Sequence, residues 1–120
     1  MRISMWLACA TVISLGSTAP VLGAGEQADP SLIAQGKAIA FNRQKGNCLA
    51  CHLIEDGELA GNTGPPLIAM QQRFPDKAQL REQIWDATVR NPQSMMPPFG
   101  KHGILTEDEL DKVVEYIYNL

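Results

Sequence analysis

Two cysteines and a histidine lie within one short segment, Cys48-Leu49-Ala50-Cys51-His52, and the rest of the fold has to accommodate what they bind. Two intervening residues make a tight loop of the redox-active kind rather than a structural disulfide. The adjacent His52 indicates c-type haem attachment, in which both thiols bond to the porphyrin vinyl groups and the histidine ligates the iron. We therefore expect Cys48, Cys51 and His52 to hold one covalently bound haem c.

Besides a chance occurrence, two other interpretations of the motif, a thioredoxin-like dithiol and a zinc site, are weaker than haem attachment. A thioredoxin-like dithiol requires a preceding strand in a βαβ unit, whereas the residues before Cys48 follow a stretch with helical periodicity. A zinc site requires four ligands, and His52 is badly placed to share a metal with the neighbouring Cys51, although His102 is also present. The N-terminal sequence adds support for haem.

The first residues have the features of a cleaved export signal. Arg2 provides the positive start, and an apolar stretch too short to span a bilayer follows from Ile3 to Leu15. We expect residues 1–24 to be a signal peptide and residues 25–120 to be the mature haem domain, soluble in the periplasm and without a membrane span. Cys9 is a poor lipid-attachment site because almost no apolar segment precedes it.

The length and charge of the chain narrow its class further. The 120 residues allow a single domain with one core. Ten Lys and Arg against 13 Asp and Glu give a net charge of −3, without the dense basic face that binding to phosphates requires. Nucleic acid is therefore not an expected partner.

Apolar spacing predicts an all-α fold of about four helices, because no segment alternates with period two over a useful length. Glycine and proline mark residues 57–66 and 91–103 as loops. Such a chain has little regular core for its size, and a buried macrocycle would supply the missing apolar volume. The first expected helix is capped by Ser31 and has Gly36 on its packing face, and a short second helix is expected at residues 67–73. The third begins at a capping box of Asp76 and Gln79 and ends at Asn91. The fourth begins at a capping box of Thr106 and Glu109 and continues to the chain end.

A sixth iron ligand is expected in the second loop. Met96 is favoured because it directly precedes the rigid Pro97-Pro98 pair, and Met95 is its main rival. Met70 lies in a predicted helix, where methionine usually packs in the core. His102 is a less favoured alternative.

The ring of His52 also needs an acceptor for its second nitrogen. The sequence Gly64-Pro65 is suited to this, because glycine allows close approach of the backbone and the Pro65 carbonyl can accept a hydrogen bond. The alternative is that these residues only form a turn.

Several segments together resemble known families. The helix Gly36–Phe41, the C-x-x-C-H motif, the Gly64–Leu67 turn and the Met96-Pro97 pair look like a class I cytochrome c. A more specific similarity is to the SoxX family, the monohaem subunits of SoxAX thiosulfate-oxidising cytochromes. It is carried by Lys45–His52, Phe74–Lys77, Gln83–Thr88 and Met96–Gly100.

The resemblance implies a class I cytochrome c fold of about four helices wrapped around one covalently bound haem. It also implies a heterodimer with a SoxA-type monohaem or dihaem cytochrome subunit. That complex, an L-cysteine S-thiosulfotransferase, conjugates thiosulfate oxidatively to a cysteine of the SoxYZ carrier. In this pattern the chain receives electrons at a haem ligated by His52 and Met96, and passes them to a downstream acceptor.

The residues themselves favour electron transfer over catalysis by this chain. Haem attachment consumes Cys48 and Cys51, and no Ser-His-carboxylate set can form with His52 on iron. A free-standing periplasmic electron shuttle is the alternative function. Lys45 and Lys101, which flank the motif and the methionine loop, are candidates for steering an acidic partner.

Overall fold

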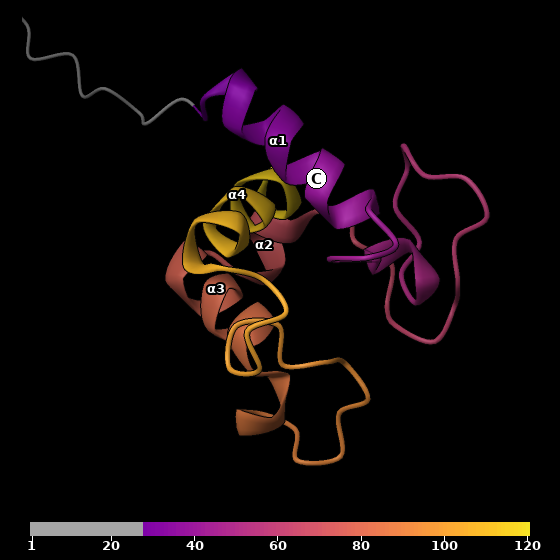
Figure 1. The fold of residues 1–120 in the computed structure, drawn as a ribbon, viewed down its shortest axis with the longest axis vertical. Coiled ribbons are helices and arrows are strands. Elements are labelled where there is room, and N and C mark those ends of the chain that lie inside the picture. The colour runs from indigo at the N-terminus through magenta and orange to yellow at the C-terminus, as the bar shows by residue number, and fades with distance from the viewer. Residues whose placement is uncertain (1–27) are drawn as a thin grey trace, which may run out of the picture.

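The structure, a computed structural model, describes residues 28–120 as an all-α fold. Within these residues there is no strand, and no helix is long and apolar enough to cross a membrane. The α-helices are α1 (Pro30–Phe41), α2 (Met70–Arg73), α3 (Lys77–Trp85) and α4 (Glu107–Tyr118), and two short 3₁₀ helices are η1 (Cys48–Ala50) and η2 (Ala87–Val89) (Figure 1). The predicted helical class and number of helices are confirmed. The predicted signal peptide, including Cys9, lies outside the described residues.

The core forms where α1 crosses α4. Gly36 is buried at this crossing, and a Cβ at this position would lie 1.9 Å from the carbonyl oxygen of Lys112. The ring of Phe41 meets Tyr116 edge to face, with 6.0 Å between the ring centroids. The expected position of Gly36 on the packing face is therefore confirmed. The buried apolar side chains of α4 are Leu110, Val113, Val114, Tyr116 and Ile117.

The first helix begins earlier than predicted. Its N-cap is Asp29, whose carboxylate accepts a hydrogen bond from the backbone N–H of Ser31 at 2.8 Å. Pro30 occupies the first turn, where a missing N–H has no cost because that group has no helical partner. The prediction of Ser31 as the N-cap is therefore wrong. The carboxylate two residues upstream performs the capping.

The capping box predicted for α4 is confirmed. The Thr106 hydroxyl accepts from the backbone N–H of Glu109 at 3.2 Å, and the Glu109 carboxylate accepts from the backbone N–H of Thr106 at 3.1 Å. The corresponding box predicted for α3 does not form. Asp76 accepts from the N–H of Ala78 at 2.9 Å, and Gln79 donates its own N–H to the Asp76 carbonyl.

The third helix is shorter than predicted. It ends at Trp85 rather than near Asn91, because Asp86 adopts an extended conformation with φ −155° and ψ 94°. The Asp86 carboxylate accepts from the backbone N–H of Thr88 at 3.0 Å and so caps η2. Similarly, α2 begins at Met70 rather than at residue 67, since Ala69 has a left-handed φ of 50°.

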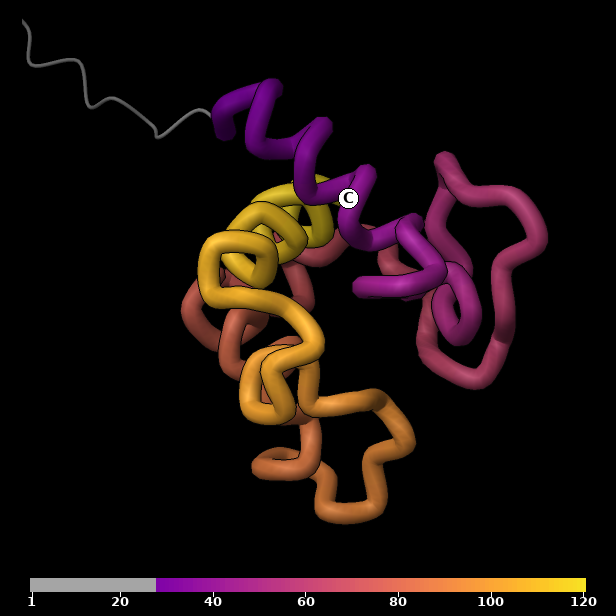
Figure 2. The backbone as a smooth tube through the Cα atoms, viewed as in Figure 1, coloured from indigo at the N-terminus to yellow at the C-terminus, as the bar shows by residue number. Residues whose placement is uncertain are grey.

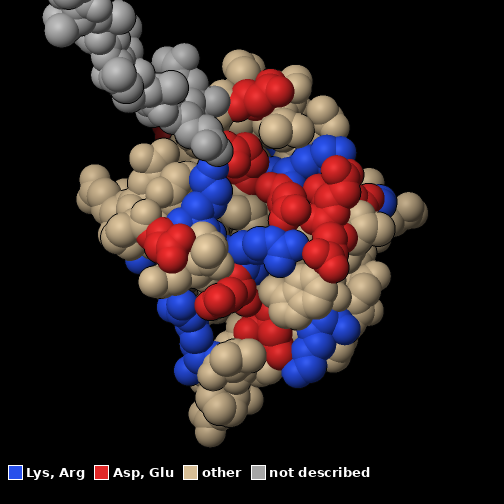
Figure 3. Space-filling view, turned by 90° about the vertical axis from the view of Figure 1, so that its left-hand side faces the viewer, with Lys and Arg blue, Asp and Glu red and all other residues tan. Residues whose placement is uncertain are grey.

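Two long loops extend from the same side of the helical core, residues 51–69 and residues 90–106 (Figure 2). The face turned toward the viewer in Figure 3 carries interleaved acidic and basic side chains. Ion pairs between α3 and α4 join Lys77 to Glu115 at 2.8 Å and Arg81 to Asp111 at 2.6 Å. Each loop carries one part of the predicted haem site.

We predict that Gly36→Ala lowers the free energy of unfolding of the haem-loaded protein by about 2–4 kcal/mol, because its Cβ collides with the α4 backbone. Guanidinium unfolding followed by circular dichroism measures the change. The exposed neighbour Gln35→Ala is the control and should change stability by less than about 0.5 kcal/mol. Equal effects of the two variants would contradict the proposed close packing.

Candidate haem-attachment site

The C-x-x-C-H segment forms a compact turn at the end of α1. Asn47 adopts a left-handed conformation with φ 47°, which asparagine tolerates better than most residues. The backbone N–H of His52 then donates to the Cys48 carbonyl at 2.9 Å. The preceding Gly46 is buried and donates its N–H to the Ile39 carbonyl at 3.2 Å, which fixes the turn against α1. The motif is thus held by the helix that packs on α4.

Cys48 and Cys51 are both free thiols and both half-buried. Burial, together with the neighbouring Cys51, raises the pKa of Cys48 to about 11. At neutral pH that thiol is protonated, whereas a reactive dithiol needs an accessible thiolate. This environment disfavours a thioredoxin-like role for the pair.

The imidazole of His52 is held by the loop that follows it. Its Nδ1 lies 2.7 Å from the carbonyl oxygen of Pro65, the acceptor expected from the sequence. Because a carbonyl can only accept, Nδ1 carries the proton and Nε2 has its lone pair available for a metal. A Cβ on Gly64 would lie 2.4 Å from Cε1 and 2.6 Å from Nδ1 of the ring. Only glycine allows the turn to approach the imidazole so closely.

Arg73, at the end of α2, supports the same turn. Its guanidinium donates to the Pro66 carbonyl at 2.8 Å and lies 3.3 Å from the sulfur of Met70. The bond to Pro66 connects α2 to the residue that directly follows Pro65, whose carbonyl oxygen is the acceptor for His52. Sequence analysis missed Arg73 because nothing in the spacing of Pro66 and Arg73 indicates that they meet.

The methionines of the second loop differ in burial. Met95 is 83% exposed, whereas Met96 is half-buried and packs against the hydrophobic core. The backbone N–H of Met96 also donates to the Ser94 hydroxyl at 3.2 Å. Met70 is 2% exposed within the core, as predicted, and His102 is exposed. Of the two loop methionines, Met96 is therefore the better ordered by packing.

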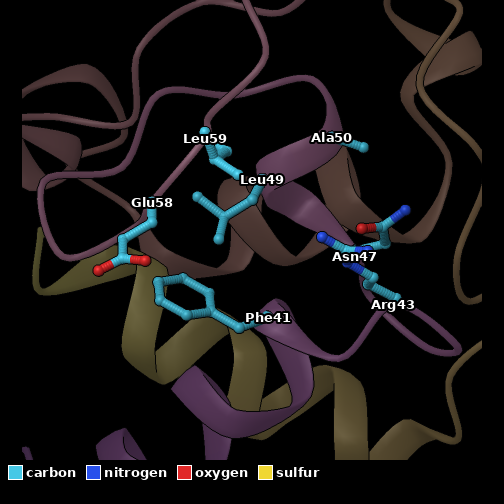
Figure 4. Close-up of a pocket in the computed structure, with 7 residues that line it drawn as sticks. All are labelled: Phe41, Arg43, Asn47, Leu49, Ala50, Glu58 and Leu59. Carbon is cyan, nitrogen blue, oxygen red and sulfur yellow. The ribbon is translucent and has the colours of Figure 1, made fainter.

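A pocket of about 310 Å³ lies beside the motif but contains none of the predicted haem ligands. Figure 4 shows Leu49 between Phe41 and Leu59 in this pocket. The remaining lining residues are Arg43, Asn47, Ala50 and Glu58. Among residues 28–120, no group of three or more His, Cys, Asp and Glu side chains is placed to hold a metal ion, so the zinc interpretation gains no support.

Both lysines considered for steering a partner have acidic partners within the chain. Lys45 forms an ion pair with Glu109 of α4, and Lys101 lies 2.7 Å from the Asp86 carboxylate. Their charges are therefore largely compensated. The expectation that they steer an acidic partner loses its basis.

The helical fold, the C-x-x-C-H turn on α1, the carbonyl-braced histidine and the Met-Pro loop together define a c-type cytochrome domain. A family profile described as cytochrome c oxidase, cbb3-type, subunit III matches residues 31–117, and the chain belongs to this cytochrome c family. The donor set fits a haem of this class, since two free thiols, an imidazole and a thioether are all present.

Two further similarities concern a solved structure and a curated relative. The crystal structure of SoxXA from P. pantotrophus superposes with a TM-score of 0.64 and 28% sequence identity, over 71% of this chain and 78% of that one. An uncharacterized lipoprotein of Aquifex aeolicus (strain VF5) is 36% identical over 77 residues, which is 63% of this chain. The match spans only 37% of that relative's length. The predicted resemblance to a SoxX-type cytochrome is confirmed by the family match and the superposition.

We predict that Gly64→Ala displaces the His52 ring and lowers the free energy of unfolding by about 1–3 kcal/mol, because the new methyl overlaps the imidazole. The Nδ1–H resonance of His52 in the ferrous protein should shift or broaden in the NMR spectrum.

Gly57→Ala is the matched control. Its Cβ would meet only the flexible end of the Leu49 side chain, which can rotate away. The His52 resonance should therefore stay in place. An unchanged resonance in Gly64→Ala as well would rule out the close approach of the turn.

Proposed function

We propose that the chain carries one haem c, joined by thioethers to Cys48 and Cys51 and ligated by His52 and Met96. The bound haem supplies reversible one-electron chemistry. The hydrogen bond from His52 Nδ1 to Pro65 would orient the imidazole and increase its basicity toward iron. The Met96 thioether would favour the ferrous state and raise the reduction potential relative to a second histidine.

We further propose that the chain is the electron-accepting subunit of a SoxAX-type L-cysteine S-thiosulfotransferase. The observation that carries this proposal is the similarity to SoxXA over most of the described domain, at 28% identity. The partner would be a SoxA-type cytochrome, with SoxYZ as a transient substrate carrier and a further protein as electron acceptor. With Cys48 and Cys51 bound to haem, residues 28–120 would have no thiol left as a nucleophile, so the role proposed for this domain is to receive and pass on electrons.

The proposed location is the periplasm, after removal of residues 1–24. The basic and apolar pattern of the N-terminus supports export. The name of the Aquifex relative, a lipoprotein, is consistent with an exported family member. Removal of the signal peptide would leave residues 25–120 as the monohaem domain, and haem would be attached in this compartment.

Co-purification tests the proposed complex. We expect the native protein from thiosulfate-grown cells to purify with a second c-type cytochrome, and deletion of either gene to stop thiosulfate consumption. The alternative function, a free-standing shuttle, predicts a monomer that exchanges electrons with several oxidases. Recovery of such a monomer, with thiosulfate consumption intact in the deletion strain, would contradict the SoxAX-type role.

Replacement of each methionine tests the iron ligands. Met96→Ala should abolish the far-red sulfur-to-iron absorption band of the ferric protein, whereas Met95→Ala should leave it unchanged because that side chain is 83% exposed. Intact mass should show covalent haem in both variants. Loss of the band in Met95→Ala alone would assign the ligand to Met95.

A further inference from the structure

The loop that carries Met96 is closed by contacts between its two ends. Asp86, just before η2, is 4% exposed, and its carboxylate accepts from both the backbone N–H and the hydroxyl of Thr88. The same carboxylate lies 2.7 Å from the ammonium of Lys101, fifteen residues further along the chain. One buried acidic group therefore bonds to residues on both sides of the methionine loop.

Backbone contacts join the same two ends. The Trp85 carbonyl accepts from the N–H groups of Gly100 at 3.2 Å and Lys101 at 3.3 Å. A Cβ on Gly100 would lie 2.0 Å from the indole of Trp85, so the ring packs directly on this glycine. Within the first end, the N–H of Asn91 donates to the Ala87 carbonyl at 3.1 Å and so continues the turn of η2. These contacts form a neck, defined here as residues 85–88 and 99–101.

We propose that the Asp86–Lys101 ion pair is a positioning device that keeps this neck closed and thereby holds the Met96 thioether at the iron. The inference rests on the proposed ligation by Met96. Neither residue is proposed to touch the haem. Closing a loop restricts its conformations, and a contact at its neck keeps the residues in its middle within reach of a fixed ligand site.

The burial of the Asp86 carboxylate makes the pair suited to this role. The side chain of Asp86 is 5% exposed and that of Lys101 is 56% exposed, so a solvent-facing ammonium pairs with a buried carboxylate that also accepts from Thr88. Those hydrogen bonds lower the pKa of Asp86 to about 2, so the carboxylate remains ionised near neutral pH. By contrast, the Lys37–Asp56 pair has side chains that are 40% and 52% exposed and joins α1 to the first loop. Removal of Lys101 leaves a buried carboxylate short of one donor, which is a larger disturbance than loss of an exposed pair.

The test measures opening of the loop in the haem-loaded ferric protein. Free imidazole binds the iron only when the methionine leaves, so its affinity reports the open population. We expect Lys101→Met to bind imidazole about fivefold more tightly than the wild type and to weaken the far-red band, because a charge-assisted hydrogen bond at the neck is lost. Lys101→Arg should restore both properties, and Lys37→Met, the matched control, should behave as the wild type.

Amide hydrogen exchange provides a second readout. The N–H groups of Gly100 and Lys101 should exchange faster in Lys101→Met, while those of α4 stay protected. If Lys101→Met does not fold, Thr88→Val, which removes one donor to the same carboxylate, should show smaller changes of the same sign. Wild-type imidazole affinity and exchange in the folded variants would overturn the positioning role. Absence of the far-red band from the wild type itself would instead refute the proposed Met96 ligation.

Discussion

Helix α1 can pack on α4 only because residue 36 has no side chain, and the rest of the domain is arranged around that crossing. A methyl group there would lie 1.9 Å from the Lys112 carbonyl oxygen. The turn that contains the two cysteines begins where α1 ends, and buried Gly46 fixes it to that helix. The position of the haem-attachment motif therefore depends on how closely two helix backbones approach one another.

The candidate site is divided between two loops that are stabilised in different ways. His52 is held by close backbone approach, since Pro65 accepts its proton and Gly64 leaves room for the ring. Met96 lies in a loop whose ends are joined by an ion pair of the buried Asp86 carboxylate with Lys101 and by the Trp85 carbonyl. In both loops, side chains and carbonyls outside the predicted ligand set hold the segments that carry the candidate ligands, an arrangement common at metal sites.

The capping box of α4 and the end of α3 show where local sequence signals are sufficient and where a tertiary contact competes with them. Thr106 and Glu109 form the expected capping box because both groups belong to the same helical turn. Helix α3 was expected to continue to Asn91, but Asp86 leaves the helical conformation to bond to Thr88 and Lys101. The partner at residue 101 is too distant in sequence for periodicity to reveal.

Local patterns are enough to predict the donor atoms of the candidate site, because C-x-x-C-H, Gly64-Pro65 and a Met-Pro pair define those atoms by residue type. Which donors are ordered and which charges are paired depends on packing. The tertiary structure half-buries Met96 and exposes Met95, and it places Arg73 against the proline turn. It also pairs Lys45 and Lys101 with Glu109 and Asp86. These outcomes depend on contacts between residues far apart in the chain, which packing establishes and local sequence does not encode.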